Sequence, residues 1–139
     1  MGEKYLVLLA SILGIVLGAN NVTDKVTGLP FCGPLPSKWW SGYINASETR
    51  SLHYVFVESL SNSTTDPVLI WFNGGPGCSS LSDFFMLSGP YIFDDGETVI
   101  KPNPWPWNLR ANMLYIENPA GVGYSWAHNP EDLLHNDIS

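Results

Sequence analysis

Three glycines and a proline follow an apolar run in the segment PVLIWFNGGPGCSS, residues 67–80. Glycine places no Cβ beside its amide, so Gly74, Gly75 and Gly77 can present N–H groups to a ligand. Because the segment leaves a strand and enters a helix, these amides and the helix dipole favour a negatively charged group. The pattern predicts a site for an oxyanion or a carboxylate. A tight turn without a ligand is the alternative, and the phosphate-loop pattern GxxxxGK[ST] is absent.

Other residue types that could do chemistry form no complete pattern. The nucleophile elbow G-x-S-x-G is absent, since residues 77–81 read GCSSL and residues 123–127 read GYSWA. We interpret Ser79 and Ser80 as helix caps. The histidines His53, His128 and His135 show no HExxH spacing, and the cysteines show no CxxC spacing. We therefore expect no metal site and no cofactor.

Three apolar runs must position the glycine segment. Residues 53–58 (HYVFVE), 68–72 (VLIWF) and 113–116 (MLYI) are rich in residues that favour strands. The second and third runs show no polar alternation, which predicts interior strands that are covered on both faces.

A helix and a hairpin are expected between the second and third runs. Residues 81–88 carry apolar side chains at helical spacing, with Ser80 as the expected N-cap and Gly89–Pro90 as the end. The Asp95–Gly96 pair predicts a hairpin turn. This order of elements predicts an α/β fold that includes a parallel pair of strands.

Composition and charge limit the functional classes. The 139 residues are 45% hydrophobic and 14% charged, which is typical of a folded globular chain of about one domain. The formal net charge is −7 and no basic cluster is present. Both features argue against a nucleic-acid partner.

The first 19 residues have the form of a signal peptide. Lys4 precedes an apolar run over residues 5–17, and the small residues Gly18 and Ala19 follow. A retained membrane anchor is the alternative, but the run is shorter than the roughly 20 residues that a membrane-spanning helix needs. We therefore expect residues 20–139 to form the mature chain, with no stable membrane span.

Asn-x-Ser/Thr triplets and cysteines agree with a secretory compartment. Asn21, Asn45 and Asn62 begin such triplets and are predicted glycosylation sites in exposed loops. The two cysteines, Cys32 and Cys78, could pair in an oxidising lumen. We expect the protein to be secreted or to reside in a lysosomal or vacuolar lumen.

Two long motifs carry a family resemblance. WFNGGPGCSSL (residues 71–81) and WNLRANMLYIENPAGVGYS (residues 107–125) resemble the signatures of the serine carboxypeptidases, peptidase family S10. Residues 28–44 and the ending DLLHNDIS support the resemblance. It implies that residues 20–139 are the N-terminal part of an α/β-hydrolase fold, incomplete and containing the first strands of its central sheet.

The resemblance also implies an activity. Family members remove C-terminal residues from peptides by a Ser-His-Asp mechanism, and these three residues are expected beyond residue 139. The chain alone is therefore expected to be inactive. The alternatives are an acyltransferase built on the same scaffold and a non-catalytic secreted glycoprotein. Expected partners are peptide or protein C-termini, and a homodimer is possible for the full-length protein.

Individual roles follow from the matched motif positions. Gly75 corresponds to a backbone N–H of the oxyanion hole. Trp71, Asn73 and Gly74 correspond to positions that hold the C-terminal carboxylate of the substrate. Cys78 corresponds to a cysteine that bonds a partner far downstream, which we favour over a bridge to Cys32; the resemblance assigns no role to Cys32.

Two positions depart from the family pattern. Leu87 stands where the family usually has a glutamate that belongs to the network around the substrate carboxylate. Its presence puts the specificity for a terminal carboxylate, or the pH dependence of that specificity, in doubt. Trp126 stands where a tyrosine is more frequent, and we interpret this as a change in pocket wall or packing.

Overall fold

The computed structural model describes residues 24–30, 32–93 and 99–134. The predicted signal peptide, residues 1–19, lies outside this range, as do Asn21 and His135. The strands are β1 Lys25–Val26, β2 Trp39–Asn45, β3 Arg50–Val57, β4 Val68–Phe72, β5 Tyr91–Phe93, β6 Ile100–Pro102, β7 Asn112–Ile116 and β8 Trp126–Ala127. The helical segments are α2 Ser80–Asp83, the π-helical η1 Phe84–Ser88, and the 3₁₀ segments η2 Trp107–Leu109 and η3 Pro130–Leu133.

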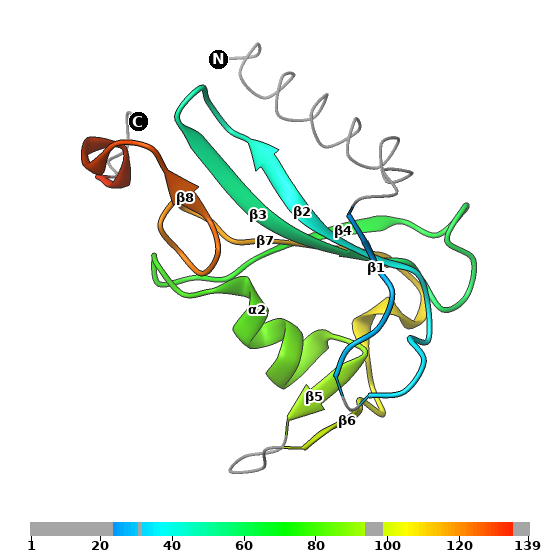
Figure 1. The fold of residues 1–139 in the computed structure, drawn as a ribbon. Coiled ribbons are helices and arrows are strands. Elements are labelled where there is room, and N and C mark those ends of the chain that lie inside the picture. Colours follow the sequence, from blue (N-terminus) through cyan, green and yellow to red (C-terminus); the bar gives the residue numbers. More distant parts are fainter. Residues whose placement is uncertain (1–23, 31, 94–98, 135–139) are drawn as a thin grey trace.

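The main sheet has the strand order β1-β2-β3-β7-β4, and β8 pairs with β3 off this path. Pairing is antiparallel from β1 to β7, while β4 runs parallel to β7. The chain reaches β7 from β4 by way of α2 and the β5–β6 hairpin, which lie on one side of the sheet (Figure 1). The three predicted strands and the parallel pair are confirmed.

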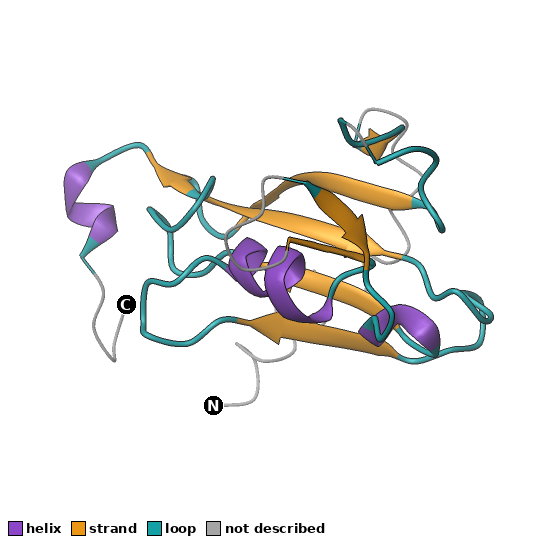
Figure 2. Ribbon diagram, turned by 90° about the horizontal axis from the view of Figure 1, so that it is seen from below, coloured by secondary structure: helices purple, strands orange, loops and turns teal. Residues whose placement is uncertain are grey.

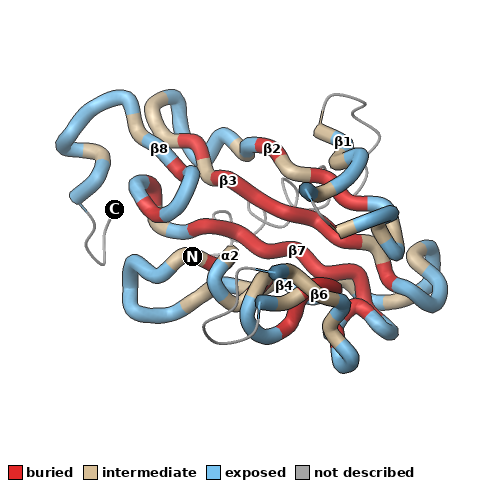
Figure 3. Tube along the Cα trace, turned by 60° about the horizontal axis from the view of Figure 1, so that its bottom comes forward, coloured by how far each residue is buried: buried red, intermediate tan, exposed pale blue. Residues whose placement is uncertain are grey.

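The prediction that residues 68–72 form an interior strand is wrong for the described part of the chain. β4 lies at the edge of the sheet, and Leu69, Ile70 and Phe72 are exposed. Figure 3 shows β7 buried along its length and β3 buried along most of its length, whereas β4 is intermediate or exposed. An apolar run indicates that the side chains of a strand are suited to burial, but the neighbouring elements decide which of those side chains are covered.

The predicted helix is present, with a different start. Ser79 is its N-cap, because the Ser79 hydroxyl accepts a hydrogen bond from the amide of Leu81. Ser80, which was expected to be the cap, is the first helical residue and is buried. The helical run ends before Gly89, as expected. Figure 2 shows this helical run against the strands of the sheet.

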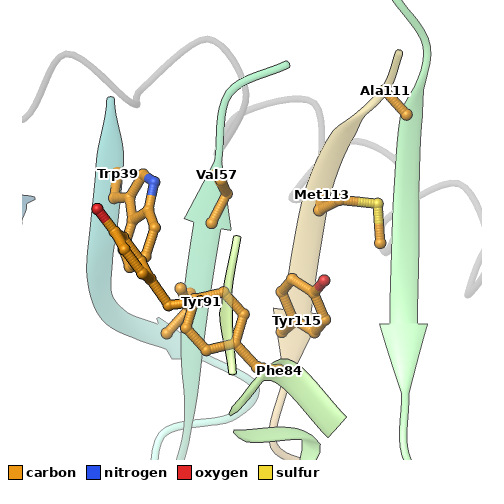
Figure 4. Packing of buried hydrophobic residues seen from close by; sticks show 8 residues of the cluster. Trp39, Val57, Phe84, Tyr91, Ala111, Met113 and Tyr115 are labelled. Carbon is orange, nitrogen blue, oxygen red and sulfur yellow. The ribbon is translucent and has the colours of Figure 1, made fainter. Parts of the chain in front are cut away.

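Apolar side chains on the helix side of the sheet form the larger core cluster. Phe84 lies at its centre, with ring centroids 5.4 Å from Trp39 and 4.9 Å from Tyr115, both in edge-to-face geometry. Figure 4 shows this packing between η1, β2 and β7. The opposite face carries a smaller cluster of Trp40, Tyr54, Phe56, Leu114 and Ile116. No helix in the described ranges is long and apolar enough to cross a membrane.

Candidate functional site

The glycine loop, defined here as residues 73–79, joins the end of β4 to the start of α2. Gly75 has φ +143° and Gly77 has φ +104°, a region that favours glycine. Both residues are exposed, as is Gly74. Among the described residues, no hydrogen bond from the amides of these three glycines is found. The loop therefore has unused donors at the carboxyl end of a parallel strand.

Side chains of the loop itself fix its two ends. The amide N–H of Asn73 donates to the Ser80 hydroxyl at 3.1 Å, and Asn73 Nδ2 donates to the Ser79 carbonyl at 3.2 Å. The Ser80 hydroxyl in turn donates to the Ile116 carbonyl at 2.7 Å. One hydrogen of the Asn73 amide group is used in this way, and the group has a second one to offer.

Trp71 lies in β4, directly before the loop. Its ring meets that of Trp107 edge to face, with centroids 5.2 Å apart. The indole nitrogen is buried and has no hydrogen-bond partner among the described residues. A buried donor without a partner is costly, so this N–H is suited to an acceptor from a ligand.

A buried carboxylate, Glu117, lies behind the loop, and only 1% of the residue is exposed. It accepts hydrogen bonds from the Ser79 hydroxyl and, at 2.8 Å, from the amide of Tyr124. Its Oε2 also lies 3.0 Å from Nδ1 of His53. Sequence reasoning assigned Glu117 no role. The available signal was a charged residue at the end of the apolar run 113–116.

His53 belongs to the same cluster of buried polar side chains as Glu117. Its Nε2 lies 2.9 Å from the Ser41 hydroxyl, and its backbone N–H donates to the Ser125 hydroxyl at 2.8 Å. Ser125 donates in turn to the backbone carbonyl of Glu117 at 2.6 Å. Both ring nitrogens of His53 therefore have protein partners.

Hollows adjoin the loop and the helix. Pro76 and Gly77 line an open hollow of about 380 Å³ together with residues 119–122 and Leu133. A second hollow, of about 410 Å³, lies between the helical run and strands β2 and β3, and His53 is among its lining residues. The glycine loop thus borders open space.

The other predicted site residues are dispersed. Cys32 and Cys78 form no disulfide within the described part of the chain, and Cys78 is an exposed residue of the glycine loop. Asn45 and Asn62 are exposed. Leu87, at the position where the family resemblance implies a glutamate, lies on η1 and is 54% exposed. Within the ranges that the structure describes, no group of three or more potential metal ligands comes together.

Comparisons with known proteins agree on one family. The family model described as serine carboxypeptidase matches residues 30–139. A serine carboxypeptidase of Caenorhabditis elegans is 48% identical over 112 residues, covering 78% of this chain and 19% of that protein. The lysosomal protective protein of Mus musculus is 45% identical over 105 residues, covering 75% of this chain and 22% of that protein.

A solved structure shows the same similarity in three dimensions. The crystal structure of a prohormone-processing carboxypeptidase from Saccharomyces cerevisiae superimposes with a TM-score of 0.60 at 28% identity. The match covers 79% of this chain and 26% of that one. The chain spans between about a fifth and three tenths of the length of the relatives that it matches.

Proposed function

This chain belongs to the serine carboxypeptidase family, and we propose that it supplies part of the substrate site of a serine-type carboxypeptidase. Residues 20–139 would form the N-terminal part of an α/β-hydrolase domain. The glycine loop would supply one half of the oxyanion hole through the amide of Gly75. Trp71, Asn73 and Gly74 would hold the C-terminal carboxylate of a peptide.

The chemistry explains why uncharged donors suit this site. A serine hydroxyl attacks the carbonyl of the last peptide bond, a histidine takes the proton, and negative charge develops on the carbonyl oxygen. The C–N bond then breaks, the amino acid leaves with the proton, and water hydrolyses the acyl-enzyme. Amide donors stabilise the oxyanion and can bind the neighbouring carboxylate without adding a positive charge.

One observation supports the proposal above the others: the amides of the exposed residues Gly74, Gly75 and Gly77 donate to no described residue. The unpartnered indole N–H of Trp71 is a further donor just before the loop. Exposed amides that are not used to close the turn can bond to water or to an incoming acceptor.

The direct test uses the protein expressed from its full coding sequence. We expect it to release the C-terminal residue from an N-blocked dipeptide and to lose activity with a serine-directed inhibitor. Transfer of the acyl group to an added alcohol in place of hydrolysis would favour the acyltransferase alternative. If the protein shows no hydrolysis and no transfer, the proposal is contradicted and a non-catalytic glycoprotein is favoured.

Substitution of the proposed oxyanion residue sharpens this test. In Gly75→Ala, a Cβ would lie 3.2 Å from the amide of Gly77 and 3.3 Å from that of Cys78, at a φ that alanine rarely adopts. We expect kcat to fall by about a hundredfold or more. Gly28→Ala is the control, because a Cβ there meets nothing within 4 Å. Equal kcat values for both variants would contradict the assignment of Gly75.

A secretory route is the second part of the proposal. One relative is named lysosomal protective protein. The signal-like residues 1–19 and the exposed Asn45 and Asn62 are consistent with passage through the secretory pathway. We expect secreted protein to shift to lower mass after endoglycosidase treatment, and Asn45→Gln and Asn62→Gln each to remove part of that shift. Unchanged mass would contradict glycosylation.

A further inference from the structure

The buried carboxylate of Glu117 has no part in the chemistry proposed above. Removing a carboxylate from water costs several kcal/mol unless hydrogen bonds compensate, so its partners are informative. They come from three separate segments: the helix cap Ser79, the backbone of Tyr124 and the ring of His53. We propose that Glu117 is a positioning residue that holds the glycine loop in the geometry that presents its amides to the substrate.

Ser79 is the connection between Glu117 and the loop. Its hydroxyl donates to the Glu117 carboxylate and accepts from the amide of Leu81 at 3.2 Å. Its carbonyl accepts from Asn73 Nδ2, at the opposite end of the loop. A change in the position of Ser79 therefore acts on both ends of the loop, between which Gly75 lies.

The carboxylate is itself held on its far side. Tyr124 and His53 both approach Oε2, which leaves Oε1 directed to Ser79. Gly123, at φ +55°, leaves the space that the carboxylate occupies, since a Cβ there would overlap the side chain of Glu117. The carboxylate is thus fixed by two contacts and positions a third group.

The same strand offers a matched control at its other end. Asn112 begins β7 and is also buried, and its Nδ2 donates to the carbonyls of Ser63 and Asp66 at 3.1 and 3.0 Å. It also accepts from the amide of Ser59 at 3.0 Å. The Asn112 side chain therefore holds a loop in place as Glu117 does, but among the described residues it has no hydrogen bond to the glycine loop.

The experiment compares three variants of the protein expressed from its full coding sequence. Glu117→Gln keeps the size of the side chain but exchanges an acceptor oxygen for an NH₂ group, Ser79→Ala removes the connection, and Asn112→Ala is the control. The catalytic effect rests on the proposed function. In Glu117→Gln and Ser79→Ala we expect kcat on a blocked dipeptide to fall by about tenfold to a hundredfold. KM should change by less than about threefold.

Asn112→Ala should lower the melting temperature but keep kcat within about twofold, because its contacts are remote from the loop. An equal loss of kcat in Asn112→Ala and Glu117→Gln would reduce Glu117 to a stabilising role and overturn the inference. Unchanged kcat in Glu117→Gln would do the same. If Glu117→Gln does not fold, the comparison of Ser79→Ala with Asn112→Ala decides in the same way.

A second measurement is independent of activity. Amide hydrogen exchange at Asn73 and Leu81, whose N–H groups donate to Ser80 and Ser79, should accelerate by about tenfold or more in Glu117→Gln relative to Asn112→Ala. Equal exchange in the two variants would overturn the inference. If the wild-type protein hydrolyses no peptide, the proposed function fails, while the exchange rates still decide whether Glu117 positions the loop.

Discussion

At the scale of single residues, Leu87 leads to a prediction about pH dependence. The family resemblance implies a glutamate there, and the leucine is 54% exposed on η1. We expect Leu87→Glu to be tolerated and to change the response to pH. A protonated glutamic acid can donate to the terminal carboxylate of a substrate, whereas the ionised form repels it.

Activity of Leu87→Glu on peptides with a free C-terminus should therefore rise at about pH 5 relative to about pH 7, by roughly tenfold. Steady-state kinetics at the two pH values measure this ratio. Met86→Glu is the control, since Met86 is the adjacent exposed residue of η1. The role assigned to position 87 is wrong if both variants give the same ratio.

Tyr115 provides a residue-scale prediction about alkaline pH. Burial raises its pKa to about 12, and its hydroxyl lies 3.0 Å from that of Ser88. The folded state favours the neutral phenol, so this contribution to stability is complete below the ordinary value of 10 and is lost as the pH rises toward 12.

Burial also raises the pKa of Tyr54 to about 12, so tyrosinate absorbance during an alkaline titration should show two groups that ionise near pH 12, and the amplitude of this late step should fall by about half in Tyr115→Phe. Denaturant unfolding at increasing pH should show the matching loss of stability. Tyr43→Phe, which alters an exposed ring, should leave this late step in place. Loss of the step in the control instead would contradict the assignment.

At the scale of elements, the helical run after the glycine loop stabilises the sheet through Phe84. This side chain is 1% exposed and contacts Trp39 and Tyr115 edge to face. Phe84→Ala should lower the free energy of unfolding by about 3–5 kcal/mol. Met86→Ala, two residues later and exposed, should change it by less than about 0.5 kcal/mol. Similar losses in both variants, measured by denaturant unfolding, would contradict this packing.

The sequence predicted the elements better than it predicted their environment. Runs of β-branched and aromatic residues identified β3, β4 and β7, because local backbone preference follows residue type. The same reasoning made β4 an interior strand, since burial depends on neighbours that a single run does not reveal. The N-cap was displaced by one residue because Ser79 and Ser80 are both suitable caps, and only tertiary contacts to Glu117 and Ile116 distinguish them.

The candidate site was predicted only in part, because a sequence pattern identifies residues that are close in the chain but not partners that are distant in it. The glycine loop is contiguous in sequence, so its residues could be named from their spacing and from the family resemblance. Glu117 could not, because its partners Ser79 and His53 are 38 and 64 positions away in the chain. No local pattern connects residues at such separations. The pairing of β3 with β7 brings His53 to Glu117, and the pairing of β4 with β7 brings the end of the glycine loop there.

At the scale of the whole molecule, β4 leaves an apolar sheet edge uncovered in the described structure. Its partner on one side is β7, while Leu69, Ile70 and Phe72 are exposed. Edge strands of this kind favour association between chains. Residues 20–139 expressed alone should therefore self-associate, and Ile70→Lys should reduce this association several-fold in light scattering.

Leu60→Lys is the control for this prediction. Leu60 is exposed to nearly the same extent as Ile70, 39% against 38%, but lies in the loop before β4. The added charge is the same in both variants, so a larger effect at Ile70 would identify the strand edge as the contact. An equal effect would show that net charge alone controls association.

The place of β7 in the sheet also governs how the chain can fold during translation. The β2–β3 hairpin closes locally, from Asn45 opposite Ser51, and can form early. β7 pairs with the other edge of β3 and is the only described partner of β4. Neither pairing can form until residues 112–116 have left the ribosome. Two apolar strands thus emerge before their common neighbour. Nascent chains of this protein should bind a chaperone that recognises extended apolar segments until residue 116 is free.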